Sequence, residues 1–503
     1  MYAMRVSFFT GLLLLASLSA SAQTTLYVNA SSGNDNVLKA NNSASTPWRT
    51  IGRAVWGSAS RSAPNASEAA AAGDTVLVAG GTYTTNEVVN NRWGVVYNPV
   101  NNGAAGRYIT VQCVGTCVLG AQFANGPVIG AETRDYVKWY ADIFQGHKWQ
   151  ITAYGPQGGN ATATQVNTTP DTGPIVCHAS TGCWVEGVDV DGGVQTDYTD
   201  NWNAFRIEQA PNSVVRNNNV HNFHNQTNSV NSTAFTLYGS PNSIVEHNTA
   251  TNVVTGLIFK DTSFTYTQSG VRVRFNKWDG VDRCFEWSMT AEDRNYVYQN
   301  LCMNSGFGIY TTAGGLSNDW IFNNTFYNVP NAAVYPTSAG AGGRFWNNIV
   351  MNAGRVVLVE AGVMPGAGVL NFEHNVYWGT SQFYSGQDGN KTFATYRSTY
   401  TSQDSAAPGS VESNPLFVNP AGGDFRLCTG AGSPAASCTA ASPAIGRAVD
   451  IGDLNGNGNT SETIRAGAFI TNTEVMGLEN SSTGGGASGS PAAPSNLRIL
   501  SSQ

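Results

Sequence analysis

The sequence predicts an all-β solenoid, and three observations indicate it. Only 12% of the 503 residues are charged, whereas a soluble domain usually has about 25%. The chain is rich in asparagine and contains 56 glycines, which leaves little material for helices. From about residue 203 to 380 the sequence repeats with a period in the twenties, and each repeat consists of short strand-like segments rather than runs at helical spacing.

The N-terminus has the pattern of an export signal. Arg5 precedes the apolar run from Phe8 to Leu18, and Ala20-Ser21-Ala22 places small residues ahead of Gln23, as at a signal-peptide cleavage site. Residues 1–22 are therefore predicted to be a signal peptide, and the mature chain to be secreted, either extracellular or periplasmic. The apolar run is too short for a permanent membrane anchor, so we expect no membrane partner.

The eight cysteines fall in pairs that are close in sequence, which suits disulfides in an oxidising compartment. Nearest-neighbour pairing is the prediction, although many other connectivities are possible. Zinc at Cys113 and Cys117 is the alternative, but no histidine cluster accompanies them. The predicted pairs are Cys113 with Cys117, Cys177 with Cys183, Cys284 with Cys302, and Cys428 with Cys438.

Seven asparagines occupy the same place in successive repeats, each near the end of a second short strand. Asparagine tolerates the left-handed backbone of a tight corner. Its amide can also donate to one neighbouring coil and accept from another, which predicts a ladder inside the stack. The seven are Asn218, Asn248, Asn276, Asn300, Asn324, Asn348 and Asn375.

The repeat and its flanking segments resemble the right-handed parallel β-helix proteins of the pectate-lyase-like superfamily. The stretch from Tyr27-Val28-Asn29 to Gly81-Thr82-Tyr83 is similar to the segment that caps the beginning of such helices. Asn414-Pro415-Leu416-Phe417-Val418 and the residues up to Gly446 are similar to the closing segment. The resemblance covers about residues 24 to 470 and implies a β-helix of about ten coils with capped ends. Lyases, hydrolases, epimerases and inert adhesins share this fold.

This resemblance gives an expected organisation of the chain. After the signal peptide, residues 23–110 form an N-terminal segment and cap, 111–400 the β-helix, and 401–478 the C-terminal closing segment. Residues 479–503 form a flexible Gly/Ser-rich tail. The motif Asp453-x-Asn455-x-Asn457 in the closing segment is interpreted as a turn rather than a calcium loop, because it has a single carboxylate.

Period-two alternation in the first strand of each unit separates a core from an exposed face. The residues expected to point inward are Phe205, Ile207, Phe235, Leu237, Leu257, Phe259, Phe285 and Trp287. One outward column contains Glu208, Tyr238, Lys260, Ser288 and Tyr310, and the other contains Arg206, Thr236, Ile258, Glu286 and Gly308. Neighbouring coils are about 4.8 Å apart, so these columns form a face long enough for an extended polymer.

Lys260 stands out on this face, with Arg283 in the connection to the next coil. Members of the superfamily use a Lys or Arg on this sheet to remove the C5 proton of a uronic acid, while a cation neutralises the carboxylate. The resemblance therefore implies a polysaccharide lyase with Lys260 as base, Arg283 on the carboxylate and Tyr238 as acid or orienting group. Glu286 is also expected to belong to this catalytic set. We expect substrate binding by Arg206, Glu208 and Tyr310; the alternative is a solvated lysine paired with Glu208 or Glu286.

Four carboxylates lie just upstream, and hard oxygen ligands beside glycines suit calcium. They are expected one or two coils from Lys260 on the same edge, where calcium-dependent lyases of this fold hold such a cluster. Calcium is therefore the candidate cofactor, and turns without metal are the alternative. The four are Asp189, Asp191, Asp197 and Asp200.

Two other functions remain open. A glycoside hydrolase needs two carboxyl groups across the scissile bond, and Glu286 with Asp261 or Asp282 are the nearest candidates. A non-catalytic polysaccharide-binding or adhesin solenoid would need neither. In each case the expected partner is an extended anionic polysaccharide and the chain a monomer, and the net charge of −7 argues against nucleic acid.

Overall fold

The structure is a computed structural model, and it describes the chain in segments. The described residues are 23–85, 87, 89, 93–121, 128–152, 173–192, 203–223, 232–260, 266–289, 292–313, 316, 318–337, 343–360, 370–402, 404, 407–454, 457, 459 and 462–479. The predicted signal peptide and residues 480–503 of the predicted tail lie outside them.

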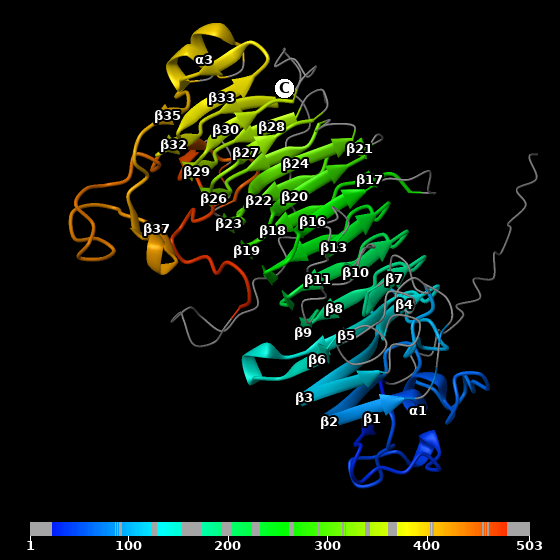
Figure 1. Cartoon of the computed structure of the whole chain (residues 1–503). Helices are drawn as coiled ribbons and strands as arrows, with labels where there is room; N and C mark the ends of the chain where they lie inside the picture. Colours follow the sequence, from blue (N-terminus) through cyan, green and yellow to red (C-terminus); the bar gives the residue numbers. More distant parts are fainter. Residues whose placement is uncertain are drawn as a thin grey trace, which may run out of the picture.

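The described chain winds into a parallel β-helix with three walls (Figure 1), as the repeat predicts. The third wall is an 11-stranded sheet. Its strands are β4 (Ile129–Glu132), β7 (Ile175–His178), β10 (Asn203–Glu208), β13 (Thr233–Tyr238), β16 (Thr255–Lys260), β20 (Arg283–Ser288), β24 (Phe307–Ala313), β27 (Ala332–Tyr335), β30 (Arg355–Leu358), β33 (Gln382–Gly386) and the antiparallel β34 (Gly389–Lys391).

The other two walls belong to one 22-stranded sheet that bends at a corner. The first wall contains β5 (Val137–Ala141), β8 (Trp184–Glu186), β11 (Val214–Arg216), β14 (Ile244–Glu246), β18 (Arg272–Arg274), β22 (Tyr296–Tyr298), β25 (Trp320–Phe322), β28 (Gly343–Trp346) and β31 (Leu370–Glu373). The second contains β6 (Lys148–Thr152), β9 (Val188–Asp191), β12 (Asn219–His221), β15 (Thr249–Thr251), β19 (Lys277–Asp279), β23 (Leu301–Met303), β26 (Thr325–Val329), β29 (Ile349–Ala353), β32 (Val376–Trp378) and β35 (Val411–Glu412). The long β2 (Thr75–Thr85) and β3 (Ile109–Ala121) extend over both walls, and β1 (Thr25–Val28) pairs with β2.

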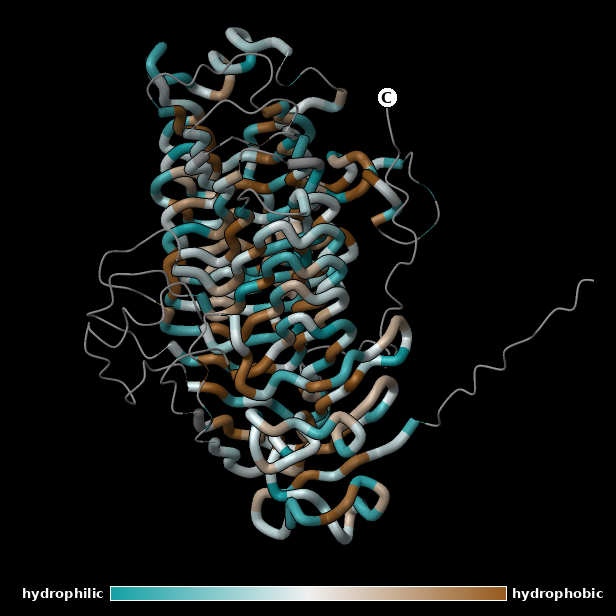
Figure 2. The backbone as a smooth tube through the Cα atoms, turned by 90° about the vertical axis from the view of Figure 1, so that its right-hand side faces the viewer, coloured by the Kyte–Doolittle hydropathy of each residue, from teal (hydrophilic) through white to brown (hydrophobic). Residues whose placement is uncertain are grey.

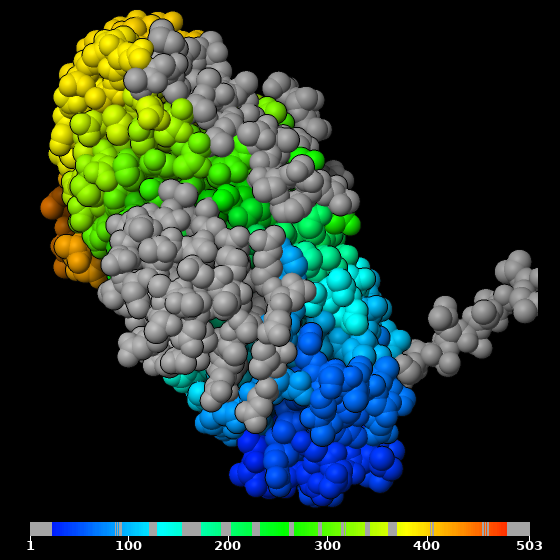
Figure 3. All heavy atoms as spheres, turned by 45° about the vertical axis from the view of Figure 1, so that its right-hand side comes forward, coloured from blue at the N-terminus to red at the C-terminus, as the bar shows by residue number. Residues whose placement is uncertain are grey.

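The coils stack along one axis (Figure 2), so the molecule is elongated, with residues near 25–60 at one end and residues near 390–400 at the other (Figures 1 and 3). One strand of the third wall belongs to each coil, and the number of coils differs little from the ten expected. Helix α1 (Ile51–Trp56) is entirely buried and lies at the N-terminal end, while α3 (Phe393–Thr399) covers the other end. Both helices cover coil edges that would otherwise expose strand and core to water.

A continuous core fills the space between the walls. All eight residues predicted to point inward from the third wall are buried in it, which confirms that part of the alternation. Side chains of the same kind stack on each other in neighbouring coils. The ring centroids of Phe205 and Phe235 are 4.9 Å apart, and so are those of Phe259 and Trp287. Fully burying one such side chain contributes about 1.5–3 kcal/mol, so repetition of the coil accumulates stability.

The predicted asparagine ladder is present and fully buried. From Asn218 to Asn348, each asparagine donates its backbone N–H to the side-chain oxygen of the next, at 2.8–3.0 Å. The side-chain amide also donates to a backbone carbonyl of the preceding coil, as from Asn300 to Val273 at 2.9 Å. Each asparagine therefore ties together three consecutive coils at the corner between the first and second walls.

The left-handed backbone at this corner belongs to the residue before each ladder asparagine, not to the asparagine itself. Asn217, His247, Phe275, Gln299, Asn323, Asn347 and His374 have φ between 50° and 60°. The sharp corner at that residue lets the next side chain point inward, where its amide can reach both neighbouring coils. The expectation that the ladder residue itself occupies the left-handed region is thus wrong by one position.

The C-terminal closing segment runs back along the outside of this corner rather than only over the end of the helix. We call its last part, residues 448–479, the C-terminal strap. Asn347 exchanges hydrogen bonds with Val449 at 2.8 and 3.2 Å, and Gly477 N–H donates to the carbonyl of Phe275 at 2.7 Å. The strap ends where Arg216 holds Glu479 at 2.7 Å. Short strands support the segment: β36 (Phe417–Asn419) with β37 (Asp424–Leu427), and β38 (Ala448–Val449) with β39 (Thr463–Ile464).

All four predicted disulfides are present, each between the expected neighbours. Cys284 on β20 and Cys302 on β23 belong to one coil, so their bond joins the third wall to the second. Four disulfides fit a chain that folds in an oxidising compartment. In the described part of the chain, no helix is both long enough and apolar enough to cross a membrane.

The ladder gives a prediction about stability. In an Asn300→Ala variant, the backbone N–H and the side-chain amide of Asn276 lose their shared acceptor, and both are buried. Each buried donor left without a partner costs about 1–3 kcal/mol, so we expect a loss of about 2–6 kcal/mol, measured as a lower midpoint of urea denaturation.

The matched control is Asn328→Gly. Asn328 also bonds to an asparagine of the preceding coil, but it is exposed and its φ of 55° suits glycine. We expect little change in this variant. Equal losses in the two variants would contradict a special role for the buried ladder.

Candidate functional site

The outward side of the third wall carries three columns of side chains, which we call the polar face. The strand register aligns Arg206, Thr236, Ile258, Glu286 and Tyr310 in one column, and Glu208, Tyr238, Lys260 and Ser288 in a second. The third column contains Asn203, Thr233, Thr255, Arg283 and Phe307. Arg283 therefore lies on the face itself, at the start of β20, and not in a connection.

Tyr310 stands in a different column from the one predicted. It pairs with Glu286 rather than with Ser288, and Gly308 is therefore not beside Glu286. The reason is that Ile309, not Phe307, fills the inner place opposite Phe285. Phe307 instead stacks on Tyr335 with ring centroids 5.4 Å apart. Sequence alignment of the strands could not show this shift, because only the packing of Ile309 and Phe307 decides it.

Arg206 and Glu208 form a buried ion pair at the N-terminal end of the polar face. Arg206 Nε lies 2.7 Å from Glu208 Oε2, and their side chains are 5% and 2% exposed. The guanidinium lies over the rings of Trp93 and Tyr238, at 4.7 and 4.4 Å from the centroids. Trp93 in turn stacks on His178 at 4.3 Å. Both predicted substrate-binding residues are thus on the face, but they are packed against each other and under aromatic rings.

Sequence reasoning missed Trp93 and His178. Trp93 comes from the segment before β3, about a hundred residues before Arg206, and no local pattern links the two. His178 could have been found, because it is in register with Glu208. Aligning one further coil towards the N-terminus would have placed it on the face.

Glu286 is a strongly perturbed acid on the polar face. Its side chain is fully buried, and burial raises its pKa to about 7 although Arg283 and Lys260 act in the opposite direction. Arg283 Nη1 lies 3.8 Å from one carboxyl oxygen, and the hydroxyls of Thr255 and Thr312 donate to the carboxyl at 3.4 and 3.3 Å. A carboxyl that titrates near neutral pH can hold or release a proton under physiological conditions.

Lys260 and Arg283 flank this carboxyl. Lys260 is half-buried at the end of β16, with its Nζ 5.6 Å from the ring centroid of Tyr238. Arg283 lies over the ring of Tyr310 at 4.5 Å, and its Nε and Nη1 are buried without a hydrogen-bond partner in the described chain. The predicted catalytic set of Lys260, Arg283, Tyr238 and Glu286 therefore comes together over adjacent coils.

The structure describes two of the four predicted metal ligands. Asp189 and Asp191 lie on β9, in the second wall, so they are not on the same edge as Lys260 as expected. Asp197 and Asp200 lie outside the described residues. β9 follows a corner of the helix that the sequence does not mark, which explains the misplacement.

Asp189 is already neutralised by its neighbours. It forms an ion pair with Lys148 at 2.9 Å and a hydrogen bond with His221 at 3.1 Å. Burial would raise its pKa, but these two bonds hold the pKa of Asp189 well below its usual range. Asp191 accepts from the amide of Asn222 at 2.9 Å. Within the described ranges no three His, Cys, Asp or Glu side chains form a group fit to hold a metal ion.

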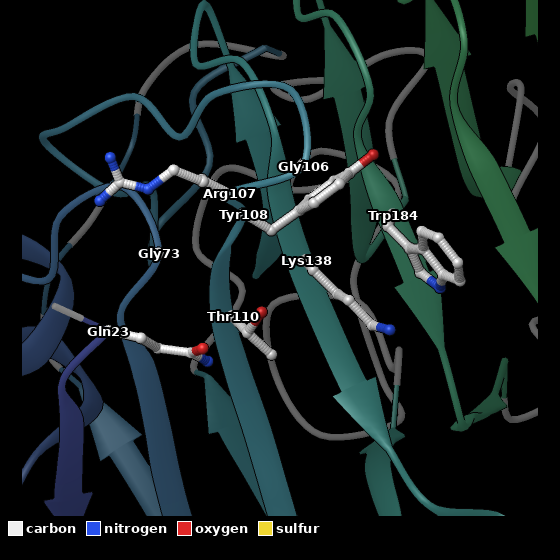
Figure 4. A pocket seen from close by; sticks show the side chains of 8 residues that line it. All are labelled: Gln23, Gly73, Gly106, Arg107, Tyr108, Thr110, Lys138 and Trp184. Atoms are coloured by element: carbon white, nitrogen blue, oxygen red, sulfur yellow. The ribbon is translucent and has the colours of Figure 1, made fainter. Parts of the chain in front are cut away.

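A separate hollow of about 300 Å³ lies on the first wall near the N-terminal end (Figure 4). Lys138 projects there, with its Nζ 4.0 Å from the ring centroid of Trp184. The lining residues are Gln23, Gly73, Gly106, Arg107, Tyr108, Thr110, Lys138 and Trp184. None of the predicted site residues lines this hollow, so the polar face and the hollow are different places.

No family model and no curated protein matches the chain. Among solved structures, it is similar to the pectate lyase Pel9A, with 14% identity and a TM-score of 0.49 over 90% of this chain and 97% of that one. It is also similar to XylC in complex with xylose, with 11% identity and a TM-score of 0.47 over 73% and 77% of the two chains. A rhamnogalacturonan lyase gives 14% identity and a TM-score of 0.41 over 78% and 90%. The likeness concerns the parallel β-helix, which the strand pairing of this chain itself confirms.

Glu286 gives a prediction about pH. Its pKa is about 7 in the folded protein and near the usual 4.5 in the unfolded chain. Between these values the folded state keeps a proton that the unfolded state has lost, so Glu286 lowers stability progressively as pH rises from about 4.5 to about 7. Relative to a Glu286→Gln variant, the free energy of unfolding of the wild type should fall by roughly 3 kcal/mol across this interval.

Urea denaturation of both proteins at a series of pH values measures the difference. Glu412→Gln, which removes an exposed carboxylate on β35, is the control and should follow the wild type. A constant difference between wild type and Glu286→Gln at every pH would contradict the raised pKa.

Proposed function

We propose that this protein is a secreted polysaccharide lyase that cleaves a uronic-acid-containing polysaccharide by β-elimination. The observation that carries the proposal is the grouping of Lys260, Arg283 and the buried Glu286 on the polar face. A base and a carboxylate-binding cation on adjacent coils are the two groups that this reaction requires. A wall of stacked strands that extends over many coils also suits a polymer better than a small metabolite.

In the proposed reaction, Arg283, which lies 3.8 Å from the Glu286 carboxyl, binds the carboxylate of the sugar. Neutralising that carboxylate makes the C5 proton more acidic. Lys260, in its neutral form, removes the proton. The electron pair of the C5–H bond forms a C4=C5 double bond while the C4–O bond breaks, and the leaving oxygen takes a proton from Tyr238.

Glu286 regulates Arg283 in this scheme. When ionised, its carboxylate competes with the substrate carboxylate for the guanidinium 3.8 Å away. Protonation of Glu286 near pH 7 removes this competitor and frees Arg283. Substrate binding should therefore weaken as pH rises through about 7, while the neutral form of Lys260 becomes more abundant, so the two groups favour opposite directions of pH.

A glycoside hydrolase is the second candidate, because a raised pKa is also what a general acid for glycosidic oxygen needs. Asp282 is the described candidate for the second carboxyl; Asp261 lies outside the described residues. Hydrolysis yields a reducing end without a double bond, so the product distinguishes the two reactions. Calcium remains a proposal, with Asp189, Asp191, Asp197 and Asp200 as its candidate ligands.

The test is a panel of uronic polymers, including pectate, alginate and a glycosaminoglycan, assayed for ultraviolet absorbance of the unsaturated product. We expect the wild type to form this product from at least one polymer. Lys260→Ala should lower kcat at least a hundredfold, because it removes the base. Lys277→Ala, which removes a lysine of β19 on the second wall, is the matched control and should keep full activity.

Each outcome has one meaning. Reducing ends without unsaturated product would establish the hydrolase instead. Full activity of Lys260→Ala would contradict the assignment of the base. Binding without any product would leave the non-catalytic solenoid as the function. Loss of activity with a chelator, restored by Ca²⁺, would support the cation site.

A further inference from the structure

A column of arginines and aromatic rings runs along the first wall, away from the polar face. The register aligns Arg272, Tyr296, Trp320 and Arg344 on successive strands β18, β22, β25 and β28. Arg294, just before β22, and Trp346, on β28, adjoin this column. We call these six residues the arginine column. At about 4.8 Å per coil, its two end arginines are roughly 14 Å apart along the helix axis.

The guanidinium groups of Arg294 and Arg344 are held in place by the rings. Arg344 lies over Trp320 and Trp346, at 4.3 and 4.5 Å from their centroids, and Arg294 lies over Trp320 at 4.9 Å. Trp320 is only 6% exposed, and it also stacks with Trp346 at 6.5 Å. A stacked arginine loses little side-chain freedom when it binds a ligand, because its plane is already fixed.

These arginines form no ion pair within the part of the chain that the structure describes. No ion pair joins Arg272, Arg294 or Arg344 to a carboxylate there, and the Nε atoms of Arg272 and Arg294 are buried without a hydrogen-bond partner. Burial and the neighbouring charge of Arg294 lower the pKa of Arg344, partly offset by Glu373. Two like charges thus stand side by side at an energetic cost that an anion would offset.

The adjacent column of the same wall shows the contrast. There Arg216 lies between Glu186 and Glu246, at 3.7 and 3.6 Å, and Arg274 binds Glu246 at 2.8 Å. Both columns face outward from the same strands, so position in the fold does not explain why one is neutralised and the other is not. Arg216 and Arg274 thus have carboxylate partners, whereas the arginines of the arginine column form no ion pair among the described residues.

The chain itself offers no obvious counter-charge from its end. The C-terminal strap packs Ile451 and Leu454 near Trp320 and Trp346. Residues 480–503 include no Asp or Glu that could neutralise the arginines.

We propose that the arginine column is a second, non-catalytic binding site for a linear carboxylated polysaccharide. Guanidinium groups bind carboxylates through two parallel hydrogen bonds, and the coil spacing is close to the length of one sugar in an extended chain. Nucleic acid is disfavoured by the net charge of −7. This inference rests on the proposed function for the identity of the polymer. A polymer held at both walls would bind more tightly than at one, through its raised local concentration.

The test measures binding in a Lys260→Ala background of the full chain, so that the polymer is not cleaved. Long polygalacturonate is titrated by calorimetry into this protein and into one that also carries Arg294→Gln and Arg344→Gln. We expect the double substitution to weaken binding about tenfold and to reduce the dependence on salt. Fully methyl-esterified polymer, which lacks the carboxylates, should bind both proteins equally weakly.

The matched control is Arg397→Gln with Arg426→Gln, which makes the same change in net charge at two arginines whose side chains are 43% and 42% exposed. This control variant should bind polygalacturonate with the same affinity as the Lys260→Ala background. Unchanged affinity in the Arg294/Arg344 variant would overturn the proposal, as would single-stranded DNA that competes with the polymer and depends on the same arginines. If the wild type shows no lyase activity but polymer binding still depends on Arg294 and Arg344, the proposed function is refuted and this inference stands.

Discussion

The buried asparagine ladder is the interaction on which the rest of the molecule depends. Each coil turns sharply at a residue with positive φ, and the asparagine that follows binds the coils on either side. Because buried backbone donors must find partners, the ladder fixes the register of one coil against the next. Every column of side chains on the three walls inherits that register.

A fixed register lets one scaffold carry different chemistry on each wall. On the third wall it places Lys260 and Arg283 beside a carboxyl that burial keeps partly protonated near neutral pH. On the first wall it produces one column of alternating glutamates and arginines, which is neutral, and beside it a column of stacked arginines, which is not. The strap closes the corner between the first and second walls, because the side chains of corner residues such as Asn347 bind its backbone.

Charge that is left uncompensated inside such a regular structure is informative. A solenoid offers each side chain a neighbour in the coils above and below. A single substitution in an adjacent coil can therefore supply an opposite charge. The carboxyl of Glu286 and the guanidinium groups of Arg294 and Arg344 nevertheless stay incompletely compensated. Strained electrostatics of this kind concentrate at functional sites, and here they occur on two walls that face different directions.

The sequence by itself determined the all-β solenoid, the buried ladder, the four disulfides and the inward residues of the third wall. These features depend on local spacing and alternation, which repeat in every coil. Tertiary structure alone decided the column of Tyr310, the wall that holds Asp189, the ion pair of Arg206 with Glu208, and the contact of Trp93 with that pair. Those features depend on where the chain turns a corner and on which distant segment packs against a wall, and neither is written in the spacing of neighbouring residues.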